Sequence, residues 1–150
     1  MDTTWSETYL NAVRSKWTMV DYYFDRLKQV EAQLTSISGS RIGERVQSSP
    51  THDALERRVL DSIDEEERLM LKFCDLLGEA NTQQDEAMER ISTLKEGHRK
   101  DFLIEYYIKR KSIKTIADVF EHSDIGSTRN LKLKALEYFE TMADRNGWKK

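Results

Sequence analysis

The first forty residues carry apolar side chains at alternating intervals of three and four positions. One column holds Leu10, Trp17 and Phe24, and a second, offset by three, holds Val13, Val20, Leu27 and Leu34. This spacing is typical of a helix packed in a coiled coil or bundle. A third column (Tyr9, Tyr23, Val30 and Ile37) lies beside them, so the apolar stripe is wide enough to contact more than one helix. The pattern predicts a helix that starts near Ser6 and ends near Ser36.

A second long helix is predicted after a polar linker over residues 36–51, which Pro50 closes. The heptad pattern resumes in two columns, one of Leu60, Cys74 and Met88 and one of Ile63, Met70, Leu77 and Ile91. Val59, Phe73, Ala80, Ala87 and Leu94 flank these columns. We expect one helix of about 44 residues, with a break or bend over residues 78–82 as the alternative. Cys74 is expected to be a small core residue.

The apolar pattern changes after Gly97 to short, closely spaced clusters. Three helices are predicted, the second of them short, with buried faces formed by Phe102, Leu103, Tyr106 and Tyr107, by Ile113, Ile116, Ala117 and Phe120, and by Leu131, Ala135, Leu136, Phe139 and Met142. Ser112 can cap the second of them, and the small Ala117 lets two helices cross closely. This order favours a helix-turn-helix, and an ordinary helical hairpin is the alternative.

The predicted fold is therefore all-α, with a long antiparallel, coiled-coil-like helical hairpin followed by a C-terminal helix-turn-helix module. The hairpin covers residues 1–97 and the module covers residues 98–150. The two long helices differ in length, so the overhanging end of the longer one must pack against the module or a second chain. We expect a homo-oligomer formed through the hairpin.

Charge is unevenly distributed between these two parts. The 150 residues have a net charge of −3, but residues 98–150 hold 12 Lys and Arg against 8 Asp and Glu, a net charge of +4. A basic C-terminal third on an acidic body suits a nucleic-acid partner, because phosphate contacts need Lys and Arg.

The sequence gives no support for a membrane protein, a secreted protein, a metal-binding protein or an enzyme. Apolar runs are only a few residues long, which argues against a membrane span, and the N-terminus lacks the pattern of a signal peptide, so a cytoplasmic location is expected. The single cysteine excludes an internal disulfide framework, and His52, His98 and His122 are too scattered for a metal site. We find no glycine-rich phosphate loop and no candidate catalytic residues, so we expect no metal, no cofactor and no enzyme activity.

The C-terminal third resembles a known family. Residues 106–120 (YYIKRKSIKTIADVF) and 133–137 (LKALE) are similar to the promoter-recognising region 4 of sigma-70-type factors, and more closely to phage and prophage regulators of the ArpU type. The linker segment 44–50 (ERVQSSP) resembles a recurring feature of the same phage family. The resemblance implies an activator of late-gene transcription in a bacterial host, with double-stranded DNA as its partner and host RNA polymerase as a further possible contact.

Two departures from that pattern affect the expected DNA-contacting residues. Glu121 stands where the family usually has glycine, at a position that tends to need a positive φ. The stretch over residues 123–136 is one residue longer than usual, so the recognition helix starts at Ser123, Asp124 or Ser127.

With Thr128, Leu131 and Ala135 directed inward, the candidate DNA-contacting residues divide into two groups. Arg129, Asn130, Ser127 and Lys134 point outward or to the flank, where Arg suits guanine and Asn suits adenine. Lys132, Lys114, Lys109, Arg110 and Lys111 suit phosphates better.

Three rival functions remain open at this point. A packaging protein similar to a phage small terminase subunit would form a closed ring of many copies. A protein-binding adaptor that acts on host RNA polymerase through the hairpin would not retain DNA at moderate salt. An enzyme has no candidate residues in this sequence.

Overall fold

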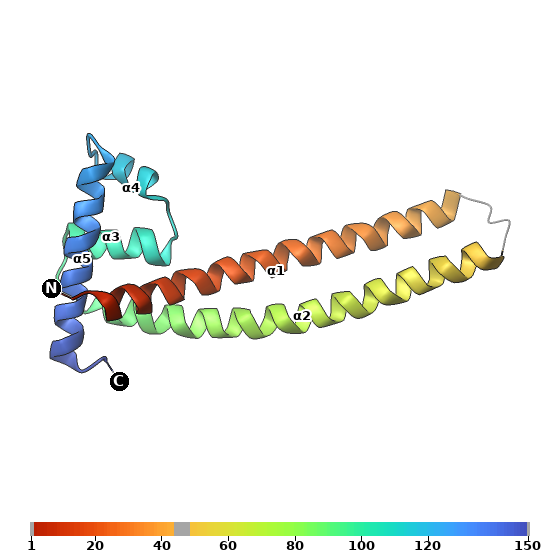
Figure 1. Ribbon diagram of the computed structural model, residues 1–150, viewed down its shortest axis with the longest axis horizontal. Coiled ribbons are helices and arrows are strands. Elements are labelled where there is room, and N and C mark those ends of the chain that lie inside the picture. The colour runs from red at the N-terminus through yellow and green to blue at the C-terminus, as the bar shows by residue number, and fades with distance from the viewer. Residues whose placement is uncertain (1, 44–48, 150) are drawn as a thin grey trace. The chain divides into compact units, whose positions relative to one another are not determined.

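The computed structural model describes residues 2–43 and 49–149, and these residues form helices and no strands. The order along the chain is α1 (Thr4–Gly43), α2 (Ser49–Ser92), α3 (His98–Leu103), the π-helical turn η1 (Ile104–Ile108), α4 (Ile113–Val119) and α5 (Ile125–Asn146) (Figure 1). The all-α class predicted from the sequence is confirmed.

The first helix is longer than the sequence pattern predicted. α1 continues to Gly43 instead of ending near Ser36, so the predicted linker over residues 36–51 is wrong in its extent. Serine and glycine lower helix propensity by about 1 kcal/mol or less per residue, which an otherwise favourable helix tolerates. Residues 44–48, which carry most of the ERVQSSP segment, lie outside the described residues. α2 has 44 residues, as expected, and runs through residues 78–82 without a break.

The chain divides into two compact units that do not coincide with the predicted boundary at residue 97. The first unit comprises residues 1–17 and 79–150, and the second comprises residues 18–78. The start of α1 and the end of α2 belong to the first unit because their side chains share a core with α3, η1, α4 and α5.

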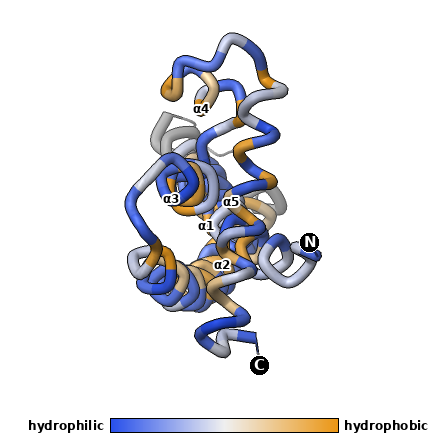
Figure 2. Tube along the Cα trace, turned by 90° about the vertical axis from the view of Figure 1, so that its left-hand side faces the viewer, coloured by the Kyte–Doolittle hydropathy of each residue, from blue (hydrophilic) through white to orange (hydrophobic). Residues whose placement is uncertain are grey.

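Aromatic stacking builds the core of the first unit. Trp5 and Tyr9 of α1 stack on each other and on Phe139 of α5, with ring centres 5.0 to 6.0 Å apart. Phe102 and Tyr107 are fully buried in the same cluster. Burial of a side chain of this size contributes about 1.5–3 kcal/mol, so this cluster is a main source of stability for the unit. The hydropathy colours in Figure 2 alternate along α5, as expected of a helix with one buried side.

In the second unit, α1 and α2 pack against each other as antiparallel helices. Leu27 and Val30 of α1 are buried with Leu69 of α2, and Arg26 forms an ion pair with Glu65 at 2.9 Å. The antiparallel pairing of two long helices follows the sequence prediction.

The face of α2 that meets α1 differs from the predicted one. Leu60 is 61% exposed, and Ile63, Met70 and Cys74 are also exposed, so the prediction that these residues form the buried column is wrong for this part of α2. Leu69 and Leu76 are buried instead, with Phe73 packed against Leu69 and its neighbours. The two candidate columns are one position apart, a rotation of about 100°, and the wide stripe of α1 accepts only one of them. Cys74 is therefore not a core residue.

Candidate nucleic-acid interface

Side-chain caps set the start of α4 and of α5. The Ser112 hydroxyl accepts a hydrogen bond from the backbone amide of Thr115 at 3.2 Å. The Asp124 carboxylate accepts one from the backbone amide of Ser127 at 2.7 Å, and this bond lowers the pKa of Asp124. α5 therefore begins at Ile125, which selects Asp124 among the three starts that the sequence left open.

The turn between α4 and α5 has one strained residue and one buried anchor. Glu121 has a φ of 55°, the left-handed conformation that glycine adopts more easily, as the departure from the family pattern suggested. The next residue, His122, lies with its Nδ1 atom 2.7 Å from the hydroxyl of the fully buried Thr128. Its backbone amide donates to the carbonyl of Ala117 at 2.9 Å. These bonds fix the turn against both helices.

The first half of α5 presents one exposed face. Thr128, Ala135 and Leu136 are buried, while Arg129 and Asn130 are exposed, as expected from the sequence. Leu133 lies between these two side chains around the helix, four residues after Arg129 and three after Asn130, and it is 55% exposed. Leu133 was not among the DNA-contacting residues expected from the sequence. We call Arg129, Asn130 and Leu133 the α5 reading face.

The other α5 candidates lie at the sides of this face or away from it. Ser127 and Lys134 are exposed on one side. Lys132 is half-buried, and its amino group lies 5.1 Å from the centre of the Tyr106 ring. Lys132 therefore points toward η1, which makes it a weaker candidate for a groove contact than Lys134.

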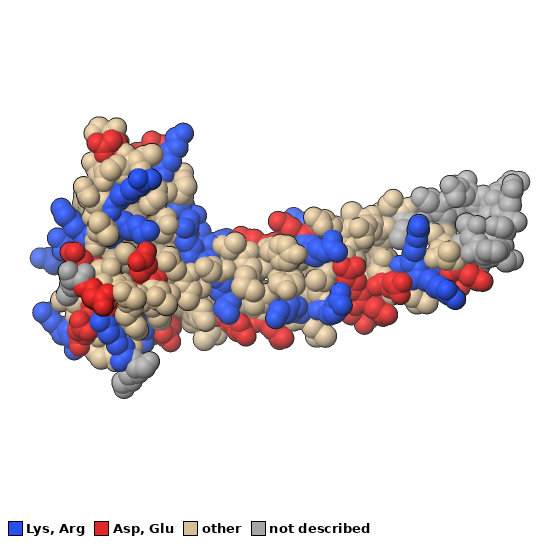
Figure 3. All heavy atoms as spheres, in the orientation of Figure 1, with Lys and Arg blue, Asp and Glu red and all other residues tan. Residues whose placement is uncertain are grey.

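The basic run before α4 is partly neutralised by one carboxylate. Glu105 forms ion pairs with Lys109 at 2.9 Å and with Lys111 at 2.5 Å, and these contacts hold the pKa of Glu105 below its usual range. Arg110, at a φ of 59°, directs its guanidinium toward Trp17, 6.0 Å from the ring centre. Lys114, in the first turn of α4, is exposed. Figure 3 shows Lys and Arg side chains gathered on the part of the first unit that holds α4 and α5, with Asp and Glu between them.

Other kinds of site find little support among the described residues. No group of three or more His, Cys, Asp and Glu side chains there is close enough together to hold a metal ion. Within the same residues, no helix has the length and apolar character needed to cross a membrane.

Comparison with known proteins identifies no relative. No family model, no curated protein and no solved structure matches this chain. The resemblance to ArpU-type regulators therefore stays a prediction from the sequence.

Proposed function

We propose that the chain is a sequence-specific regulator of transcription that binds double-stranded DNA. α4, the turn and α5 would form a helix-turn-helix, with α5 as the recognition helix. The observation that carries this proposal is the α5 reading face, where Arg129, Asn130 and Leu133 are exposed together on the side opposite the buried Ala135.

The three side chains of this face suit the edges of bases in the major groove. An arginine can donate two hydrogen bonds to guanine, and an asparagine can pair with adenine through its amide. A leucine between them offers an apolar contact to the methyl group of thymine. Neither Arg129 nor Asn130 makes an ion pair or side-chain hydrogen bond with another described residue, so both are available to a ligand.

Exposed cations around the reading face suit the phosphate backbone. Lys114 lies in the first turn of α4, and Lys134 follows Asn130 by one turn on α5. Phosphate contacts place a protein on the duplex without reading its sequence. Lys109, Arg110 and Lys111 would add to this field, although Glu105 offsets part of their charge.

The biological role rests on the resemblance to ArpU-type regulators. On that basis we propose activation of late genes of a phage or prophage in the cytoplasm of a bacterial host, with host RNA polymerase as a further partner. Binding to promoter fragments, as opposed to packaging sites, distinguishes this role from that of a small terminase subunit.

We further propose that two or more copies associate through the second unit. The exposed apolar side chains of α2 in this unit keep the three- and four-residue spacing of a coiled coil: Leu60, Ile63, Met70 and Cys74. A second copy with the same column would cover these side chains. We expect Met70→Lys to lower the mass in sedimentation to that of a monomer and to leave the helix content unchanged, because the Met70 side chain is 44% exposed on the surface of α2. A wild-type mass equal to one chain at every concentration would contradict this association.

The DNA-binding proposal is tested by selection from random duplexes. We expect the wild-type chain to enrich a defined sequence and to bind it more tightly than a scrambled duplex in a mobility-shift assay. Arg145→Ala, at the exposed end of α5, is the matched control and should bind like the wild type. If no sequence is enriched and no duplex is retained at moderate salt, the DNA-binding proposal fails and an adaptor function is favoured.

A further inference from the structure

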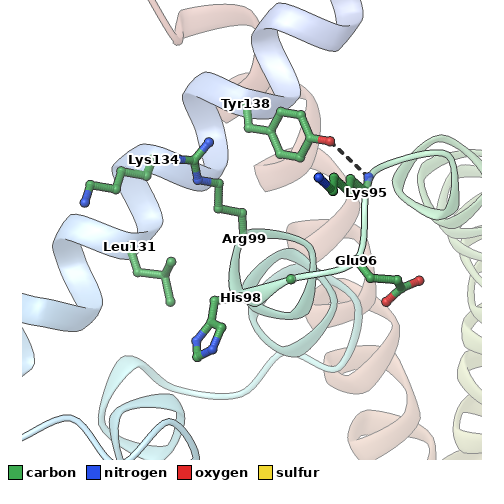
Figure 4. A pocket seen from close by; sticks show the side chains of 8 residues that line it. Lys95, Glu96, His98, Arg99, Leu131, Lys134 and Tyr138 are labelled. Carbon is green, nitrogen blue, oxygen red and sulfur yellow. Dashed lines mark hydrogen bonds between the residues drawn. The ribbon is translucent and has the colours of Figure 1, made fainter.

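A cavity on the flank of α5 is lined by three Lys and Arg side chains and one carboxylate. Its volume is about 550 Å³, and it lies between the residues that join α2 to α3 and one side of α5 (Figure 4). The lining residues are Lys95, Glu96, Gly97, His98, Arg99, Leu131, Lys134 and Tyr138. All of them belong to the first unit.

The basic side chains of this cavity have no acidic partner in the part of the chain that the structure describes. Among the described residues, Lys95, Arg99 and Lys134 form no ion pair. The one carboxylate in the lining, Glu96, lies 2.6 Å from Lys100, so its charge is already compensated. The lining therefore carries three cations without ion pairs, and an anion bound in the cavity would offset part of this charge.

The aromatic and apolar side chains of the lining suit the base and sugar of a nucleotide. The Tyr138 hydroxyl accepts a hydrogen bond from the backbone amide of Lys95 at 2.9 Å, which holds the ring against that segment. The Arg99 guanidinium lies 5.9 Å from the centre of the Tyr138 ring. Leu131 adds an apolar side chain from the same helix. A volume of about 550 Å³ holds more than a single phosphate ion.

We infer that this cavity binds the phosphate of a nucleotide unit, with Arg99 and Lys134 as its main cationic contacts. Two sources share this chemistry, namely a backbone phosphate of bound DNA and a free nucleotide. Lys134 follows Asn130 by one helical turn, so a DNA strand that passes the reading face could place a phosphate here. With DNA as the source, the inference rests on the proposed function. With a free nucleotide it does not.

One set of variants separates the two sources. Arg99→Ala and Lys134→Ala remove the cations, and Arg145→Ala removes an exposed cation from the end of α5 as the control. In the DNA arm, each cavity variant should weaken binding to the selected and the scrambled duplex alike, by about fivefold, and lower the salt slope by about one. In the nucleotide arm, AMP is titrated into each protein and followed by the NMR signals of the backbone amides of residues 95–99.

The two titrations together decide whether the cavity binds a phosphate and from which source. A loss in the DNA arm that spares the control supports a backbone phosphate in the cavity. AMP-dependent shifts that vanish in both variants, with DNA binding unchanged, support a free nucleotide. If wild-type protein binds no DNA but shows these shifts, the proposed function fails and the cavity site stands. If both variants match the wild type in both arms, the inference is overturned.

Discussion

The backbone amide of Ser6 lies 3.3 Å from the Oε1 atom of Glu140, a residue 134 positions further along the chain. Ser6 belongs to the first turn of α1, where backbone amides have no partner within the helix, and Glu140 belongs to α5. The other carboxylate oxygen of Glu140 pairs with Lys149 at 2.5 Å. One buried carboxylate therefore connects the start of the chain, the last helix and the C-terminal segment within the first unit.

Replacement of Glu140 should destabilise the first unit. Glu140→Ala leaves the buried Ser6 amide without an acceptor, which costs about 1–3 kcal/mol. Glu140→Gln keeps an acceptor oxygen and should cost less. Urea unfolding followed by circular dichroism measures the difference, with Glu137→Ala on the exposed side of α5 as the control. Equal stability of Glu140→Ala and Glu137→Ala would contradict this role.

Glycine at position 121 should stabilise the protein. The left-handed conformation costs a residue with a Cβ atom about 1–2 kcal/mol, and Glu121 adopts it with a φ of 55°. Glycine avoids that cost but gains freedom in the unfolded chain, so Glu121→Gly should raise the free energy of unfolding by up to about 1 kcal/mol. Asp118→Gly, inside α4, should lower it by about the same amount. A lower melting temperature for Glu121→Gly than for wild type would refute the strain argument.

Tyr107 should make the protein less stable at alkaline pH. Its side chain is fully buried, and burial raises the pKa of its hydroxyl above the ordinary value of 10.0. Below that value both states keep the proton. Above it the unfolded chain releases the proton while the folded chain retains it, so the free energy of unfolding falls as pH rises.

The Tyr107→Phe variant isolates this effect. The hydroxyl of Tyr107 has no hydrogen-bond partner among the described residues, so its removal should not lower stability at about pH 8. Between about pH 8 and about pH 11 the variant should lose less stability than wild type, whereas Tyr22→Phe, at an exposed position, should behave like wild type. A pH dependence identical in all three proteins would show that Tyr107 ionises normally.

Removal of the Glu105 charge should strengthen DNA binding. Glu105→Gln frees Lys109 and Lys111 from their ion pairs, so more positive charge faces the duplex. We expect tighter binding to selected and scrambled duplexes alike, with a salt slope steeper by about one to two. Glu89→Gln, at an exposed position of α2, serves as the control. Weaker or unchanged binding by Glu105→Gln would place the basic run away from DNA.

Local signals in the sequence predicted much of this structure. The length of α2, the Ser112 cap and the buried side of α5 follow from spacing and capping residues, which act over one or two helical turns. The face of α2 that meets α1 could not be predicted from local signals. α2 has two apolar columns one position apart, and only packing against α1 determines which one is buried. Because α1 packs on one column, the other column, which contains Leu60, Ile63, Met70 and Cys74, is left exposed.

In the candidate site, too, features set by neighbouring residues were predictable and features set by distant residues were not. The exposure of Arg129 and Asn130 followed from the buried positions around them. The pairing of Lys109 with Glu105 had a signal, their four-residue spacing, whereas the pairing of Lys111 depends on the chain reversal at Arg110. The cavity joins residues 95–99 to residues 131–138, and no local pattern reveals a contact over that separation.

The most direct test of the account combines a change in the protein with a change in the DNA. Binding is measured for wild type and Arg129→Ala on the selected duplex and on duplexes with each guanine replaced in turn. We predict that one replacement costs wild type about 1–3 kcal/mol and costs Arg129→Ala almost nothing, because the contact is already absent. If every replacement costs both proteins the same, Arg129 reads no base, and α5 does not lie in the groove as proposed.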